Sequence, residues 1–263
     1  MIIKRETNQK LAKNSIMDNK FNKKEILKNA IKLSVIIPLY NEENTIKNVI
    51  QKIPKYDNLE IIVVDDGSTD SSIEKVKDLK EKDQRISICK HKQNIGYGQA
   101  ILTGFKKAKG DIVVTLDSDG QHAPKDIFKL IKPIIENEAD VVIGSRYLGD
   151  CYYMVPFYTQ MGEILIKLVL WFLFGINVGN NQSGFRAFRK EVLPYFHDLR
   201  NRGMGLTTEI LFQSGLKNMR VKEVPIKVFP RIYGFSYVNL FKIIRSIFSC
   251  FIFYFIKKIF NSK

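Results

Sequence analysis

Four short apolar runs, each ending abruptly in polar residues, constrain the fold of this chain most. They lie at 33–37, 61–64, 113–116 and 140–143 and consist mostly of Val, Ile and Leu. Continuous apolar runs of this length predict strands that are buried on both faces. Helical stretches separate them, and this alternation predicts an α/β fold: a Rossmann-like, mostly parallel sheet with helices on both faces.

Polar side chains follow the carboxyl end of each run. In open α/β sheets the carboxyl ends of the strands form the ligand-binding edge, so we expect these side chains to gather there. Ordinary loop chemistry explains each one alone, but their repetition at four strand ends favours a binding site. The residues are Tyr40, Glu42, Asp65, Asp66, Asp117, Asp119, Gln121 and Arg146.

The segment LDSDGQ predicts a metal site. Asp117 and Asp119 lie one residue apart after a buried strand, and neighbouring carboxylates repel each other unless a cation lies between them. Mg²⁺ or Mn²⁺ prefers such oxygen ligands, and Gln121 offers a third oxygen. The alternative is a solvated loop or a helix cap before Pro124.

Six motifs, in this order, carry a family resemblance. The chain resembles the family-two glycosyltransferases of GT-A fold, and within them the dolichol-phosphate mannose synthase branch. The resemblance covers 33–237, which is the expected catalytic domain. The motifs are PLYNEENTI, VVDDGSTDSS, NIGYGQAILTGFKKAKGD, LDSDGQHAPKDI, GSRYLGD and QSGFRAFRKEVLP.

The resemblance implies a nucleotide-diphosphate sugar as donor. The metal at Asp117, Asp119 and Gln121 would bridge the donor's diphosphate. The positions that would line the nucleoside pocket are Pro38, Tyr40, Glu42 and Asp66, with Asp65 as an alternative to Asp66. Gly96 and Gly98 suit a backbone that approaches a ligand closely, although an ordinary turn explains them equally well.

The resemblance also implies a polyprenyl phosphate as acceptor. This acceptor is already ionised, so attack with inversion at the anomeric carbon needs no general base. Arg146 and Arg231 match the family's phosphate-binding arginines and, with Asp119, are the expected catalytic residues. Arg186 is a third candidate, for which we expect a structural pairing with an acid.

Two departures from the family pattern leave the acceptor open. Asn180 replaces an aspartate, and Tyr237 replaces a lysine. A glycolipid or a cell-surface polymer precursor is therefore an alternative acceptor. A non-catalytic protein that binds sugar nucleotides or lipids on the same fold is the alternative outside enzymes.

The composition indicates an anionic partner. The formal net charge is +15, and no zinc finger, RNA-binding aromatic motif or helix-turn-helix pattern is present, which disfavours nucleic acid. Three scattered cysteines argue against a disulfide framework and favour a reducing setting. We therefore expect the protein at the cytoplasmic face of a membrane.

Three segments bear on membrane contact. Residues 1–32 form a basic extension without an apolar core, so they are no signal peptide. Met161–Phe174 is a candidate membrane-contacting helix, with a buried core helix as the alternative and an expected i,i+4 pair between Glu163 and Lys167. Residues 238–263 predict a basic amphipathic helix in the membrane interface, with a packed or a spanning helix as alternatives.

Overall fold

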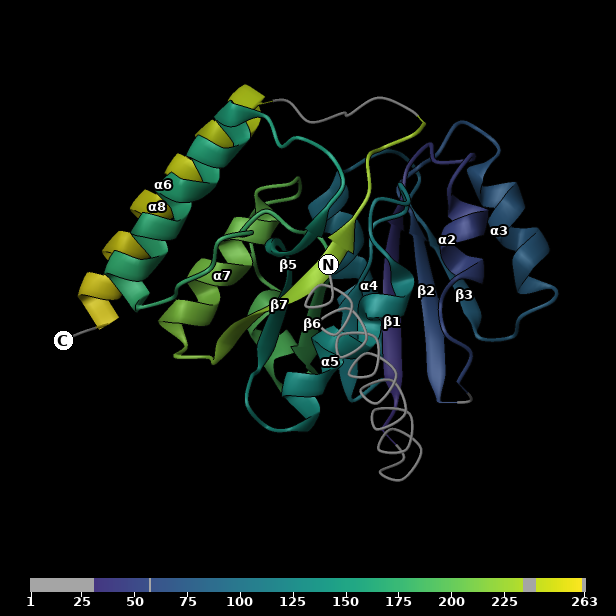
Figure 1. Ribbon diagram of the computed structural model, residues 1–263, viewed down its shortest axis with the longest axis horizontal. Coiled ribbons are helices and arrows are strands. Elements are labelled where there is room, and N and C mark those ends of the chain that lie inside the picture. Colours follow the sequence, from purple (N-terminus) through teal and green to yellow (C-terminus); the bar gives the residue numbers. More distant parts are fainter. Residues whose placement is uncertain (1–30, 57, 234–239, 262–263) are drawn as a thin grey trace, which may run out of the picture.

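The computed structural model describes residues 31–56, 58–233 and 240–261, and for 240–247 and 261 only the backbone. Its centre is a seven-stranded sheet in the order β3-β2-β1-β4-β6-β5-β7, with helices packed on both of its faces (Figure 1). The predicted α/β fold with a mostly parallel sheet is confirmed. The basic extension and the Tyr237 departure fall on 1–30 and 234–239, outside the described residues.

The described elements alternate along the chain as the apolar pattern predicts. They are β1 (Leu33–Leu39), α2 (Ile46–Gln51), β2 (Leu59–Asp65), α3 (Ser72–Lys80), β3 (Ile86–Lys90), α4 (Tyr97–Lys107), β4 (Ile112–Thr115), η1 (Pro124–Asp126), α5 (Ile127–Ile135), β5 (Val141–Cys151), α6 (Phe157–Phe174), β6 (Arg186–Arg189), η2 (Lys190–Phe196), α7 (Leu206–Leu216), β7 (Val221–Val228) and α8 (Leu240–Asn261).

One strand reverses the direction of the sheet. β1 pairs in parallel with both β2 and β4, and β5 pairs in parallel with β7. β6 is antiparallel to both of its neighbours, β4 and β5. The carboxyl ends of β1, β2 and β4 therefore meet at one edge, where the predicted polar cluster lies.

Side-chain alternation along β1 builds a core on each face of the sheet. Val35 and Ile37 point into a core formed with α2 and α5. Ile36 points to the other face, into a core formed with α4, η2 and α7. All three side chains are fully buried, as expected for a mostly apolar strand inside a parallel sheet.

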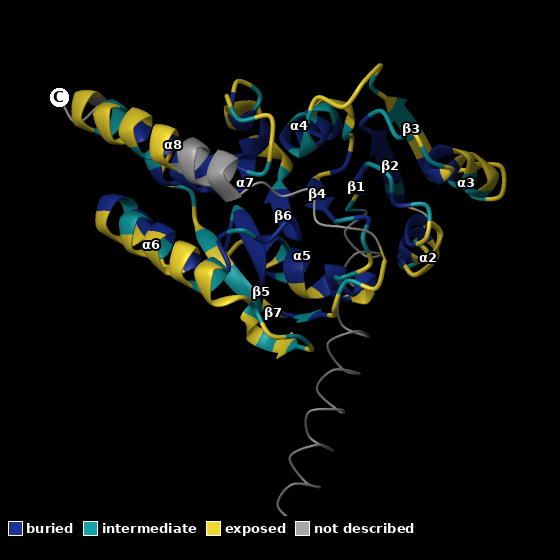
Figure 2. Ribbon diagram, turned by 90° about the horizontal axis from the view of Figure 1, so that it is seen from above, coloured by how far each residue is buried: buried dark blue, intermediate teal, exposed yellow. Residues whose placement is uncertain are grey.

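A third apolar cluster joins α6, α7 and α8 outside the sheet. α6 and α8 run along the same side of the molecule in two perpendicular views (Figures 1 and 2). Phe212 of α7 stacks on Tyr254 of α8, with 5.6 Å between ring centroids, and meets Phe174 of α6 edge-on. α7 therefore packs against both α6 and α8.

The strand that contains GSRY is longer than predicted. β5 continues from Val141 to Cys151 because it pairs with β7 over that length, with a register shift between Ser145 and Asp150. Arg146 therefore lies within a strand, and its expected place on a loop after residue 143 is wrong. Pairing with a partner 80 residues away outweighs the local polar sequence.

Candidate active site

The loops after β1 and β2 are joined by side-chain to backbone hydrogen bonds. The backbone N–H of Asn41 donates to Ser68 Oγ, and that of Glu42 donates to Ser72 Oγ at 2.8 Å. In return Asn41 Oδ1 accepts the N–H of Thr69. Asn41 holds a positive φ of 52°, which asparagine tolerates better than most residues. The motifs PLYNEE and DDGSTDSS thus fix each other next to Pro38 and Tyr40.

The two aspartates at the end of β2 have different roles. Asp66 accepts the backbone N–H groups of Ile95 and Gly96, and its Oδ1 lies 2.7 Å from His91 Nδ1. Its carboxylate is therefore occupied in holding the segment 91–96. Asp65 accepts the N–H of Ser68 through Oδ1, while its buried Oδ2 has no hydrogen-bond partner. That Oδ2 lies 3.8 Å from Lys90 Nζ, so Asp65 retains one oxygen without a hydrogen bond whereas both oxygens of Asp66 are engaged.

The glycines of NIGYGQA approach protein rather than open space. A Cβ on Gly96 would collide with the carbonyl oxygen of Arg202, and one on Gly98 would lie 2.7 Å from the carbonyl oxygen of Gly203. The N–H of Gln99 also donates to Arg202 O at 3.0 Å. The requirement for glycine at these positions comes from the segment 201–203, which packs over the start of α4.

Asp117 is held from several sides. The Tyr97 hydroxyl donates to Asp117 Oδ1 at 3.1 Å, and His122 Nδ1 lies 3.5 Å from Oδ2. A Cβ on Gly184 would collide with this carboxylate. Burial, and to a smaller extent the charge of Asp119, raises the pKa of Asp117. The sequence reasoning missed Tyr97 and His122, although both lie inside motifs that it quoted.

Asp119 and Gln121 link the sheet edge to the segment after β7. Asp119 Oδ1 accepts the N–H of Gln121 at 3.0 Å. Gln121 exchanges hydrogen bonds with Phe229, accepting at its carbonyl and donating from Nε2. Phe229 in turn stacks on Tyr152, with 5.1 Å between ring centroids. The predicted metal ligands therefore lie next to the loop that leads into α6.

Arg231, near the far end of the chain, pairs with the acidic edge, by which we mean the carboxylates of Glu42, Asp117 and Asp119. Its NH2 group pairs with Glu42 Oε1, and its NH1 lies 3.7 Å from Asp119 Oδ2. Burial raises the pKa of Glu42, although the charge of Arg231 opposes this effect. The structure thus places the predicted catalytic residues Asp119 and Arg231 in one ion-pair network.

The acidic edge suits a divalent cation. Glu42 and Asp119 already share one cationic group, the guanidinium of Arg231, and Asp117 and Asp119 repel each other. Among the described residues, no group of three or more Asp, Glu, His or Cys side chains could hold a metal by itself. A magnesium-type site with one or two carboxylates, completed by substrate phosphate and water, fits this arrangement.

Arg146 faces α6 and not the carboxylates of the acidic edge. Its NH2 donates to Glu163 Oε1 at 2.7 Å, and its NH1 donates to Tyr153 at 2.9 Å. The other oxygen of Glu163 accepts the Tyr147 hydroxyl. The expected pair between Glu163 and Lys167 is wrong, because Glu163 turns inward and is only 2 % exposed.

Arg186 and Asn180, in and just before the motif QSGFR, are both engaged with backbone carbonyl groups. Arg186 is fully buried and donates its hydrogen bonds to the carbonyl oxygens of Ser183, Thr207 and Asn181, while the charge of Asp117 acts on it without a hydrogen bond. Burial lowers its pKa to about 10. Asn180 donates from Nδ2 to Gly144 O at 3.2 Å. The Oδ1 of Asn180 is buried and has no hydrogen-bond partner, and an aspartate at this position would place a carboxylate against the Gly144 carbonyl.

The helices beside the site expose large apolar side chains. We call this surface the α6–α8 face (Figure 2). Among the described residues, α6 is long and apolar enough to cross a membrane, and 22 % of its apolar window is buried in the fold. The alternative of a buried core helix is therefore wrong. The exposed side chains are Phe157, Tyr158, Met161, Ile164, Leu165, Leu168, Trp171 and Phe172 of α6, and Phe248, Ile252, Phe253, Phe255, Ile256, Ile259 and Phe260 of α8.

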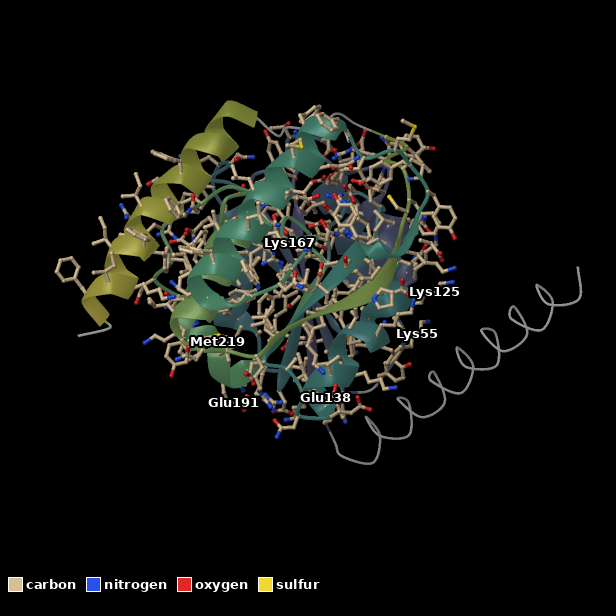
Figure 3. All side chains as sticks on the ribbon, turned by 60° about the vertical axis from the view of Figure 1, so that its left-hand side comes forward. Lys55, Lys125, Glu138, Lys167, Glu191 and Met219 are labelled. Carbon is tan, nitrogen blue, oxygen red and sulfur yellow. The ribbon has the colours of Figure 1, made fainter. Side chains whose placement is uncertain are left out.

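The other face of α8 packs against the domain. Cys250 and Tyr254 are buried, and the Tyr254 ring stacks on Phe212 of α7. Lys258 lies 5.0 Å from the ring centroid of Phe174 on α6. Figure 3 shows α6 in front, with Lys167 labelled on it, and α8 to its left. α8 thus combines two predicted alternatives, a packed face and an exposed apolar face.

The comparisons with known proteins assign the family. The description Glycosyl transferase family 2 matches residues 34–196, and the chain belongs to this family. It is 36 % identical to the UDP-N-acetylglucosamine–dolichyl-phosphate N-acetylglucosaminyltransferase of Methanococcus voltae, over 77 % of this chain and 87 % of that protein. It is 35 % identical to the dolichol-phosphate mannosyltransferase of Pyrococcus furiosus, over 83 % of this chain and 63 % of that protein.

Solved structures confirm the GT-A fold. Glucosyl-3-phosphoglycerate synthase from Mycobacterium tuberculosis, in complex with Mn²⁺, UDP and phosphoglyceric acid, superposes with a TM-score of 0.67. The match covers 86 % of this chain and 81 % of that one, at 23 % identity. The predicted family and fold are thus confirmed, and the chain is a glycosyltransferase.

Proposed function

We propose that this protein is a metal-dependent, inverting glycosyltransferase that moves a hexose from a nucleotide-diphosphate sugar to a polyprenyl phosphate. It would work at the cytoplasmic face of a membrane, with residues 33–237 as the catalytic domain and 238–263 as a membrane-associating tail. One observation carries the proposal: the acidic edge is linked, through Gln121 and Phe229, to Tyr152 in the segment that leads into α6, and α6 exposes large apolar side chains. A nucleotide sugar at the acidic edge and the lipid chain of the acceptor beside α6 could therefore lie next to each other.

The names of the relatives support both substrates. One acts on UDP-N-acetylglucosamine and dolichyl phosphate, and the other is a dolichol-phosphate mannosyltransferase. In the donor half we assign Pro38, Tyr40 and Asp65 to the nucleoside, and Asp119, with Asp117 and Gln121 beside it, to the metal and diphosphate. Asp66 and Gly96 shape the wall of this pocket through the segment 91–96.

The proposed reaction is one displacement at the anomeric carbon. An acceptor phosphate oxygen forms the new bond to that carbon, and the bond to the donor diphosphate breaks on the opposite face. A bound divalent cation would neutralise the charge that grows on the leaving diphosphate. Because the acceptor is already an anion, the protein must supply positive charge and need not remove a proton.

Two arginines supply that charge in our assignment. Arg231 lies at the acidic edge, and a guanidinium binds phosphate through two parallel hydrogen bonds. Arg146 lies within β5, and it would have to leave Glu163 to bind the acceptor phosphate directly. We therefore assign the principal acceptor contact to Arg231.

A lipid-product assay tests the proposal. Full-length protein in detergent is incubated with Mn²⁺, a defined polyprenyl phosphate and, in turn, UDP-N-acetylglucosamine, UDP-glucose and GDP-mannose, and the lipid fraction is analysed by mass spectrometry. We expect one glycosyl-phosphoprenol product, which disappears with EDTA or with Asp119→Asn. Transfer to other membrane lipids, with polyprenyl phosphate unused, would refute the acceptor assignment.

A further inference from the structure

We infer that His91 positions Asp66, and that this pair fixes the wall of the nucleoside pocket formed by the segment 91–96. The role rests on the proposed function, because it requires a nucleotide donor, and it adds a residue that lies outside the six family motifs. His91 is a positioning residue in this role, since it acts on the donor through Asp66 and need not contact the nucleotide.

His91 joins the ends of β2 and β3 to α4. Its Nδ1 lies 2.7 Å from Asp66 Oδ1, and its Nε2 lies 2.9 Å from Thr103 Oγ1 on α4. Its backbone N–H donates to the carbonyl oxygen of Asp65 at 2.8 Å. Both ring nitrogens are thus engaged, and the side chain is only 12 % exposed. His91 therefore holds a fixed position at the end of β3.

The carboxylate of Asp66 determines which nitrogen of His91 carries the hydrogen. A carboxylate offers only lone pairs, so Nδ1 donates to Asp66. In the neutral imidazole Nε2 is then the acceptor, and the Thr103 hydroxyl donates to it. The bonds to Asp66 and Thr103 together fix the tautomer and the orientation of the ring before any ligand binds.

Asp66 needs this support because its backbone donors belong to the segment that it holds. Oδ1 accepts the N–H of Ile95 at 3.1 Å, and Oδ2 accepts that of Gly96 at 2.8 Å. Neither donor can fix the carboxylate independently of that segment. His91 can, because Thr103 and the end of β3 anchor it. Removal of the imidazole would leave a carboxylate that is 4 % exposed without its side-chain donor, and a buried acceptor that loses a partner is costly.

The segment 91–96 reaches both halves of the donor site. It packs so closely on Gly67 that a Cβ there would lie 2.7 Å from the carbonyl carbon of Gln93. It then leads into α4, where the Tyr97 hydroxyl donates to Asp117. A shift of this segment would therefore move both the wall beside the nucleoside and the residue that supports Asp117. We expect loss of the imidazole to weaken nucleotide binding.

The nucleotide affinity of three variants tests this role. Full-length protein in detergent is titrated by calorimetry with UDP and, separately, with GDP, each in the presence of Mn²⁺. His91→Ala should bind the preferred nucleotide about tenfold more weakly, the size expected for one lost hydrogen bond to a charged group. His91→Asn keeps an N–H close to the position of Nδ1, so it should recover most of this loss. His91→Gln keeps one close to the position of Nε2, toward Thr103, and should not.

Amide hydrogen exchange gives a second measurement, which needs no ligand. His91→Ala should speed exchange at Ile95 and Gly96 about tenfold, and His91→Asn should restore it. The amides of β1 should exchange as in wild type, which shows that the variant is folded. His197→Ala is the matched control, because it removes the same side chain just after η2. Its nucleotide affinity and its exchange at Ile95 and Gly96 should equal those of wild type.

Two outcomes would overturn the role of His91 while the proposed donor stands. One is a nucleotide affinity of His91→Ala equal to that of wild type. The other is recovery by His91→Gln as large as that by His91→Asn. Wild type that binds neither UDP nor GDP would instead overturn the proposed nucleotide donor, and the pocket role with it.

Discussion

The ion pair between Arg146 and Glu163 is predicted to be the main polar link between α6 and the sheet. Glu163→Ala removes the carboxylate that is 2 % exposed and accepts from both Arg146 and Tyr147. Breaking a buried pair by deleting one partner costs about 3–5 kcal/mol. Because the Arg146 side chain is 14 % exposed and Tyr147 reaches solvent, we expect the lower end, about 3 kcal/mol.

That loss is measurable by thermal unfolding. For a chain of this size, about 3 kcal/mol corresponds to a Tm lower by about 6–10 °C. Circular dichroism of full-length protein in detergent follows the transition. Lys167→Ala, four residues further along α6, is the matched control, and it should change stability by less than about 0.5 kcal/mol.

A double variant separates the pair from the cavity that alanine leaves. Replacing both partners of a buried pair with apolar residues of similar size is often close to neutral. Glu163→Leu combined with Arg146→Met should therefore recover most of the lost Tm. If the Tm of Glu163→Ala lies within about 2 °C of wild type, the loss of stability is under about 1 kcal/mol. The ion pair with Arg146 is then not the main polar link between α6 and the sheet.

Three further predictions address the membrane face, pH and the acidic edge. Phe248→Glu with Ile252→Glu should weaken sedimentation with anionic liposomes about tenfold or more, whereas Lys77→Glu, with the same change in net charge, should retain most binding. Burial, and then the bond to Glu163, raises the pKa of Tyr147 to about 12. The neutral phenol therefore stabilises the fold below pH 10, and urea titrations should show this advantage over Tyr147→Phe disappearing as the pH rises from 10 to about 12. Gly184→Ala should lower kcat/KM about a hundredfold by displacing Asp117, whereas Gly162→Ala, with no atom near its Cβ position, should retain activity; equal rates for both would contradict the packing against Asp117.

Local sequence determined the elements and the position of the acidic edge. Short runs rich in Val and Ile, each followed by polar residues, favour buried strands, and they correctly place β1, β2 and β4. Because parallel strands end at the same edge, Glu42, Asp65 and Asp119 had to lie near one another once the sheet was parallel. The match of residues 34–196 to glycosyl transferase family 2 follows from the same motifs.

Only the tertiary structure decided which charges meet. Glu42 and Arg231 are 189 residues apart. Glu163 of α6 pairs with Arg146 of β5, whereas helical periodicity alone predicted a pair between Glu163 and Lys167. Sequence spacing reports which residues share a face of one element, but the partner of a charge depends on how separate elements pack. Burial completes the choice, because a carboxylate removed from water requires a cation or hydrogen-bond donors within reach.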